Sequence, residues 1–117
     1  MVEEAKSYEV IVTNPAQERF FNQILDYMEH HFSEERVNYI KKMLFQDISS
    51  LGIRPHRGTK EFSLAARKEE FRYILFRETR ILEIKIIYWI EEAEQKVFVT
   101  DLFPTKMNPS KMGKLGE

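Results

Sequence analysis

The sequence LEIKIIYWI at residues 82–90 and the sequence VFVTDLF at residues 97–103 decide the fold of this chain. Both stretches are apolar and rich in β-branched and aromatic residues, which is typical of strands. The polar residues 91–96 between them predict a turn, so the two strands form an antiparallel hairpin. Because side chains alternate along a strand, the first stretch has two distinct faces. One face carries Leu82, Ile84, Ile86, Tyr88 and Ile90, and the other carries Glu83, Lys85, Ile87 and Trp89.

Helical periodicity precedes this hairpin. Residues 8–13 predict a short strand, and Asn14 followed by Pro15 is a typical helix start, with Asn14 as the cap. This helix is expected to end near His31. Ser33 caps a second predicted helix, which ends at Gly52. Its apolar side chains recur at steps of three and four and form one seam, made of Val37, Ile40, Leu44, Ile48 and Leu51.

The remaining segments complete a small α+β domain. Residues 52–60 form a basic loop, residues 61–66 a short extended piece, and residues 71–77 another strand. The order is therefore β-α-α-β-β-β. A helix hairpin buries its apolar stripes most economically on one face of a four-stranded, mainly antiparallel sheet. We expect one domain over residues 8–109, with residues 1–7 and 110–117 as flexible ends.

Composition excludes several classes of protein. The chain has 117 residues, a net charge of −1 and no cysteine. Disulfides and cysteine-based zinc or thiol chemistry are therefore excluded, which fits a reducing cytoplasm. No overall positive field draws the protein to nucleic acid, so such a role needs a local basic patch. The N-terminus lacks the apolar core of a signal peptide, and no stretch is long enough to span a membrane.

The basic loop and the strand after it form the first candidate site. Its histidine has the pKa range of a general acid or base, so His56 is the candidate proton carrier, with Arg72 to stabilise a developing phosphate charge. The candidate phosphate-binding residues are Arg54, Arg57, Lys60 and Arg77. The alternative is a solvated loop whose charges have no ligand. Adjacent histidines on a helix point about 100° apart, so His30 and His31 do not share an ion. We expect no metal and no cofactor.

The second candidate site is the strand face that points away from the helices. Lys85, Ile87 and Trp89 combine charge with a large aromatic side chain, which is typical of a binding hot spot. A partner protein would cover this face. The alternative is that another segment of the same chain folds over it.

The order of these elements, with several local motifs, resembles the RelE/ParE toxin superfamily of type II toxin–antitoxin, or plasmid stabilisation, proteins. The resemblance spans roughly residues 8–109. It rests on the segment 8-YEVIVTNPA-16, Pro55 and Gly58 after the second helix, Arg72 opening a strand, Ile86-Ile87-Tyr88 in the next strand, and Asn108-Pro109.

The resemblance implies a cytoplasmic toxin that is held silent by a cognate antitoxin, as a homodimer or a complex with that antitoxin. RelE-like members cleave mRNA on the ribosome, whereas ParE-like members inhibit DNA gyrase. The nucleases use basic residues near the loop together with a C-terminal His or Tyr, and no His or Tyr follows Tyr88 here. We therefore expect a toxin that acts by binding a target such as gyrase. The alternatives are a ribosome-dependent mRNA interferase and a non-toxic interaction protein that retains the fold.

Overall fold

The computed structural model describes residues 7–79 and 82–107. The two flexible ends predicted from the sequence fall almost entirely outside these ranges, as do Asn108 and Pro109. None of the helices in the described parts of the chain combines the length and the apolarity needed to cross a membrane.

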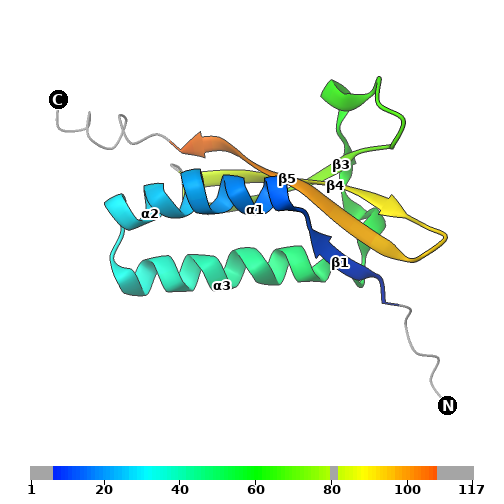
Figure 1. The fold of residues 1–117 in the computed structure, drawn as a ribbon. Coiled ribbons are helices and arrows are strands. Elements are labelled where there is room, and N and C mark those ends of the chain that lie inside the picture. The colour runs from blue at the N-terminus through cyan, green and yellow to red at the C-terminus, as the bar shows by residue number, and fades with distance from the viewer. Residues whose placement is uncertain (1–6, 80–81, 108–117) are drawn as a thin grey trace, which may run out of the picture.

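Five strands and two long helical segments make up the described residues (Figure 1). The first helical segment is continuous: α1 (Asn14–Arg19) passes through a π-helical turn, η1 (Phe20–Leu25), into α2 (Asp26–His31). The second is α3 (Glu34–Ser50). The strands are β1 (Glu9–Val12), β2 (Thr59–Lys60), β3 (Arg72–Thr79), β4 (Leu82–Glu91) and β5 (Lys96–Met107). Two short 3-10 turns, η2 (Pro55–Arg57) and η3 (Phe62–Leu64), flank β2.

The sheet has the order β1-β5-β4-β3-β2, and only the β1–β5 pair is parallel. The prediction of an α+β fold with a mainly antiparallel sheet is confirmed, but the prediction of four strands is wrong. The fifth strand, β2, has two residues, too few to carry a periodic signal, and it pairs only with Arg72 and Tyr73. The extended piece predicted at residues 61–66 is also wrong, because η3 bends the chain there.

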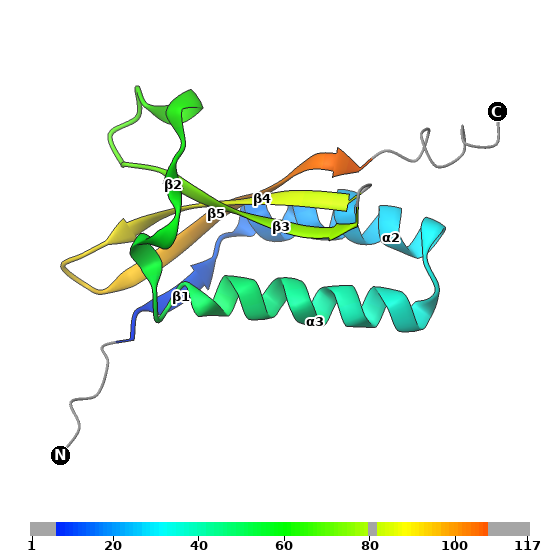
Figure 2. The ribbon, with the colours of Figure 1, turned by 180° about the vertical axis from the view of Figure 1, so that it is seen from behind.

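Both helical segments lie on the same face of the sheet (Figures 1 and 2). The predicted seam of α3 is confirmed, since all five of its apolar residues are buried in the core. The prediction that Leu82, Ile84, Ile86 and Tyr88 face the helices is confirmed in the same way. From the first helical segment the core receives Ala16, Phe20, Ile24, Tyr27 and Met28, and from β5 it receives Val97, Val99 and Leu102.

The starts of the two helices differ in how they are capped. Ser33 is the predicted N-cap of α3, and its Oγ accepts a hydrogen bond from the backbone N–H of Arg36 at 3.1 Å. Asn14 was predicted to cap α1, but Thr13 occupies that position. The hydroxyl of Thr13 does not cap the helix, because it donates to the carbonyl of Val99 on β5 at 3.1 Å. Pairing with β5 therefore fixes where α1 begins.

Gly52 joins the end of α3 to the start of the sheet. Its carbonyl accepts a hydrogen bond from the N–H of Tyr8 at 2.7 Å. A Cβ atom at this position would lie 2.7 Å from the carbonyl oxygen of Tyr8, which is closer than real contacts allow. Glycine is therefore required here because two backbone segments approach closely. A left-handed conformation is not the reason, since the φ of Gly52 is not positive.

Replacing Leu44 with alanine tests the assignment of the core. The side chain of Leu44 is fully buried at the centre of α3, so Leu44→Ala should lower the free energy of unfolding by about 2–5 kcal/mol. Lys42→Ala on the exposed side of α3 is the matched control, and it should change that free energy by less than about 0.5 kcal/mol. Urea unfolding measures both. A loss for Leu44→Ala as small as that of the control would contradict the assignment.

Candidate functional site

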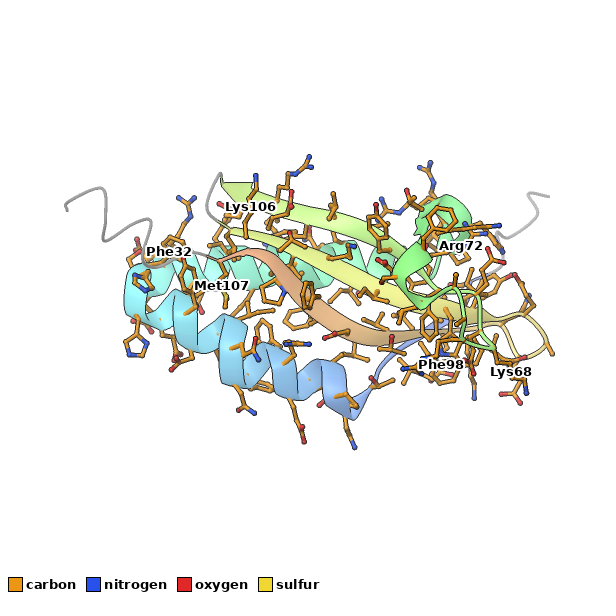
Figure 3. The ribbon with its side chains drawn as sticks, turned by 90° about the horizontal axis from the view of Figure 1, so that it is seen from above. Phe32, Lys68, Arg72, Phe98, Lys106 and Met107 are labelled. Atoms are coloured by element: carbon orange, nitrogen blue, oxygen red, sulfur yellow. The ribbon has the colours of Figure 1, made fainter. Side chains whose placement is uncertain are left out.

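The face of the sheet opposite the helices carries no α-helix of the described residues (Figures 1 and 2). We call this the open face. It is formed by Tyr73, Leu75 and Arg77 on β3, by Glu83, Lys85, Ile87 and Trp89 on β4, and by Phe98, Asp101 and Phe103 on β5. The segment of residues 61–71, which we call the arm, rises above one end of this face (Figure 1). In Figure 3, which looks onto the open face, Arg72, Phe98 and Lys68 lie at the arm end and Lys106 and Met107 at the other.

Lys85 lies at the centre of the open face and is already paired. Its Nζ donates to Glu61 Oε1 of the arm at 2.7 Å and lies 4.3 Å from the centroid of the Tyr73 ring. The other oxygen of Glu61 accepts hydrogen bonds from the backbone N–H and the hydroxyl of Ser63. These contacts lower the pKa of Glu61, the hydrogen bond from Lys85 most strongly. Glu61 is 7% exposed, so the pair anchors the arm to the sheet.

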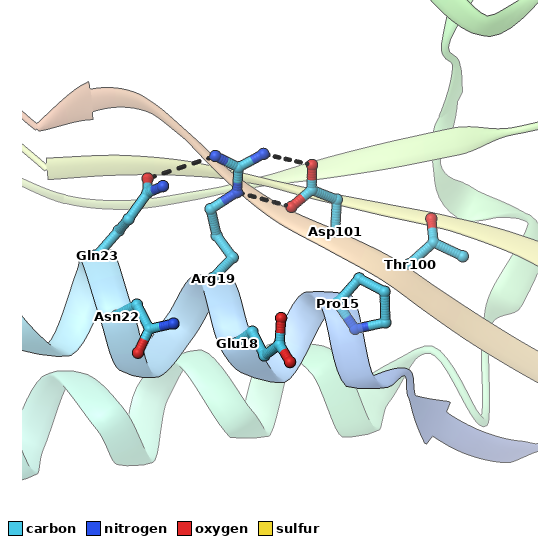
Figure 4. A pocket seen from close by; sticks show the side chains of 7 residues that line it. All are labelled: Pro15, Glu18, Arg19, Asn22, Gln23, Thr100 and Asp101. Atoms are coloured by element: carbon cyan, nitrogen blue, oxygen red, sulfur yellow. Dashed lines mark hydrogen bonds and ion pairs between the residues drawn. The ribbon is translucent and has the colours of Figure 1, made fainter.

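A second anchoring contact comes from the helical side of the molecule (Figure 4). The guanidinium of Arg19 on α1 donates two hydrogen bonds to the carboxylate of Asp101 on β5, of 3.0 Å from Nε and 3.1 Å from Nη2. Its guanidinium carbon lies 5.3 Å from the centroid of the Phe103 ring. Asp101 faces the open side because it is the register partner of Ile87. The positive charge of Arg19 and the negative charge of Asp101 therefore neutralise each other on the open face.

A third pair occupies the end of the open face away from the arm. Arg77 on β3 forms an ion pair with Glu83 on β4. The hydroxyl of Thr105 donates to the remaining oxygen of Glu83 at 2.6 Å. These two contacts lower the pKa of Glu83, the one from Thr105 more strongly. Three cations of the open face thus have their own carboxylates, whereas Lys106, the register partner of Glu83, is exposed and forms no ion pair with the described residues.

Apolar side chains fill the space between these pairs. In the row that crosses the sheet at Lys85, Leu75 lies on one side of it and Phe103 on the other. These two side chains are 38% and 43% exposed, whereas Ile87 is only 8% exposed. The Trp89 ring stacks on Phe98 with centroids 5.0 Å apart. Of the predicted partner-binding residues, Trp89 is accessible in part, Ile87 is largely covered and Lys85 is paired with the arm.

The predicted catalytic residues His56 and Arg72 lie together at the arm end of the sheet. Arg72 Nη1 donates to the carbonyl of Gly58 at 2.9 Å and to that of His56 at 3.4 Å. His56 Nε2 lies 2.6 Å from Glu92 Oε2, and Glu92 Oε1 accepts the hydroxyl of Tyr8 at 2.8 Å. These hydrogen bonds lower the pKa of Glu92, the one from His56 most strongly. The carboxylate of Glu92, in the β4–β5 turn, links η2 to the residue that precedes β1.

Beneath this cluster Tyr88 holds the basic loop in place. Its hydroxyl donates to the carbonyl of Pro55 at 2.6 Å and accepts from the N–H of Gly58 at 3.0 Å. Tyr88 is fully buried, in keeping with its place on the strand face that points toward the helices. Burial raises the pKa of its phenol, so it stays protonated at neutral pH. A Cβ at Gly58 would meet the Tyr88 hydroxyl at 2.3 Å, so glycine is required here.

The structure disperses the remaining predicted phosphate-binding residues. Arg57 donates to the hydroxyl of Ser50 at 2.6 Å, and Lys60 lies 3.7 Å from Glu70 Oε2. Glu70 also pairs with Arg72 at 3.3 Å. The side chain of Arg54 forms no hydrogen bond or ion pair with the part of the chain that the structure describes. Together with Arg77, which lies at the far end of β3, these residues do not converge on one point.

Sequence reasoning missed Leu75, Phe103, Arg19 and Glu61. Alternation along β3 and β5 could have placed the first two on the open face. The contacts of Arg19 and Glu61 span 82 and 24 positions in the sequence, and no local pattern signals them. We find no group of three or more potential metal-ligating side chains among the described residues. The arrangement offers partly exposed apolar side chains that lie between ion pairs.

Comparison with known proteins adds no assignment. No family model matches this chain, and neither the curated proteins nor the solved structures give a significant match.

The pair of Glu61 and Lys85 should make stability depend on pH. Glu61→Gln leaves Lys85 without a negatively charged partner, and we expect a loss of about 1–3 kcal/mol in the free energy of unfolding at pH 7. Because folding lowers the pKa of Glu61, its contribution is complete above the unfolded value of about 4.3 and is lost as the pH falls through the folded value. The difference from wild type should therefore shrink below about pH 4.

Urea unfolding at several pH values between 7 and 3 measures this difference. Glu69→Gln in the same arm is the matched control, because the side chain of Glu69 forms no ion pair with the described residues. A Glu61→Gln protein that is as stable as this control at pH 7, or a deficit that does not change with pH, would contradict the assigned pair.

Proposed function

We propose that this chain is the toxin component of a bacterial toxin–antitoxin pair, acting by binding a target such as DNA gyrase. A cognate antitoxin would be its neutralising partner. The proposal joins the resemblance to the RelE/ParE superfamily with the character of the open face. The α+β fold and the chain order of its long elements agree with what that resemblance implies, apart from the short additional strand β2.

One observation carries the choice of binding over RNA cleavage. Three cations of the open face are paired with carboxylates, in the Lys85–Glu61, Arg77–Glu83 and Arg19–Asp101 contacts. Such a face offers little net charge to a phosphate backbone, and affinity for nucleic acid depends on unneutralised Lys and Arg. Apolar side chains between neutralised charges instead suit a protein surface, where aromatic residues supply most of the binding energy.

Induced expression in bacterial cells tests the proposal, with Phe103→Ser as the informative variant. Wild type should arrest growth and inhibit gyrase in a supercoiling assay. Phe103→Ser removes an exposed aromatic side chain from the open face and should weaken target binding by about tenfold or more. Phe21→Ser changes the same type of side chain on the helical side, where Phe21 is 58% exposed, and it should remain toxic.

Equal toxicity of Phe103→Ser and wild type would contradict binding through the open face. Wild type that is expressed in the folded state without arresting growth would instead favour a non-toxic interaction protein.

A second candidate function, ribosome-dependent mRNA cleavage, is favoured by the His56 cluster. A histidine held by the Glu92 carboxylate beside Arg72 has the elements of an acid–base pair with a cation. If this candidate is right, primer extension on mRNA should reveal cleavage by wild type and none by folded His56→Ala. Under the binding proposal no such cleavage appears, and His56→Ala retains the toxicity of wild type.

A further inference from the structure

The edge of the sheet at β3 is only partly covered. β2 pairs with Arg72 and Tyr73 and then leaves the sheet, so the rest of β3, residues 74–79, has no strand beyond it among the described residues. Figure 2 shows this part of β3 running along the edge of the sheet above α3. Uncovered edges present unpaired backbone groups and readily accept another strand.

The backbone groups of this edge point outward at alternate residues. The carbonyl of Phe71 accepts a hydrogen bond from the N–H of Glu61, so its polar groups face the side on which β2 lies. Since backbone groups alternate in direction along a strand, those of Leu75 and Arg77 face the same side. Beyond the end of β2 these groups have no backbone partner within the described ranges.

A groove runs between this edge and α3. Its volume is about 460 Å³, and its walls come from α3 and β3 alone. The apolar part of its lining includes Tyr39, which is 52% exposed, together with Met43 and Leu75. The edge and the groove together offer backbone hydrogen bonds and side-chain contacts to one extended segment.

The charges around the groove define the chemistry of that segment. Asp47 lines the groove half-buried, and its carboxylate forms no hydrogen bond or ion pair with the described residues. The other charged groups of this edge are satisfied: Glu78 pairs with Arg36 at 2.7 Å, and Arg77 pairs with Glu83. A partly buried, unpaired carboxylate favours a cationic side chain in an occupant.

We propose that residues 74–79 of β3 and the adjoining groove bind an extended segment of another protein as an additional strand. Alternate side chains of that segment enter the groove, apolar ones against Tyr39 and Met43 and a Lys or Arg beside Asp47. A second copy of this chain is a poorer occupant, because its equivalent edge brings another unpaired Asp47 and arginines that are already paired. The site adjoins the open face, with which it shares Leu75 and Arg77 of β3, but it does not depend on the proposed function.

A capped heptapeptide of the pattern Thr-Val-Thr-Lys-Thr-Val-Thr is a suitable probe. Its valines and lysine share one face in the extended conformation. Binding is measured by fluorescence anisotropy, and amide chemical shifts of the isotope-labelled protein locate the peptide. We expect saturable binding below about 1 mM, with the largest shifts at Leu75 and Arg77. Replacing the central Lys with Glu, or N-methylating the amides that face β3, should weaken binding about tenfold.

Asp47→Asn should remove most of the preference for Lys over Glu while leaving the N-methylation effect intact. Glu35→Gln, an exposed carboxylate near the start of α3, is the matched control and should bind the peptide as wild type does. The proposal is overturned by no saturable binding at about 1 mM, by shifts centred on Trp89 and Phe103, or by a Lys preference that survives Asp47→Asn.

Discussion

The parallel pairing of β1 with β5 is the constraint on which the rest of the structure depends. It joins Glu9–Val12 to Lys96–Val99, in the first and last strands along the chain. A parallel pair requires a long crossover connection, and the helix hairpin begins that crossover. Both helical segments therefore lie on one face, and the other face is left without helices. The same pairing brings Tyr8 next to Glu92 and so to the His56 loop.

The open face is the consequence that matters for function. A surface of strands without helices would expose isolated charges and aromatic rings to solvent, yet this one neutralises three of its cations within the chain. The arm supplies Glu61, α1 supplies Arg19, and β4 supplies Glu83. A protein partner that covers these pairs meets few unpaired charges, so the cost of removing water from them is lower. A nucleic acid gains little from them, because few condensed counterions are released.

The sequence predicts the parts of this fold that repeat with a regular period. The α3 seam, the Ser33 cap and the two faces of β4 follow from local patterns, and the structure confirms them. Regular patterns fail where tertiary contacts decide the outcome. Thr13 takes the cap position from Asn14 because its hydroxyl bonds to β5, and β2 exists only because β3 offers an edge.

The candidate site is less predictable than the fold for the same reason. Composition identifies its basic residues but not their partners, which lie far away in the sequence or on another element. The spacing of Arg72 and Arg77 does predict that they cannot share one site, and their contacts lie at opposite ends of β3. The π-helical turn η1 interrupts a stretch with ordinary helical periodicity, and no residue in it signals the change.

The central claim is that ion pairs neutralise most of the charges on the open face, and that this face therefore binds protein rather than nucleic acid. Titration of a labelled single-stranded RNA dodecamer at about 50 and 200 mM salt tests this most directly. The account predicts weak binding that changes little between the two salt concentrations. Submicromolar binding at the lower salt, lost by tenfold or more at the higher, would contradict it, because such a loss requires several free cations that contact phosphates.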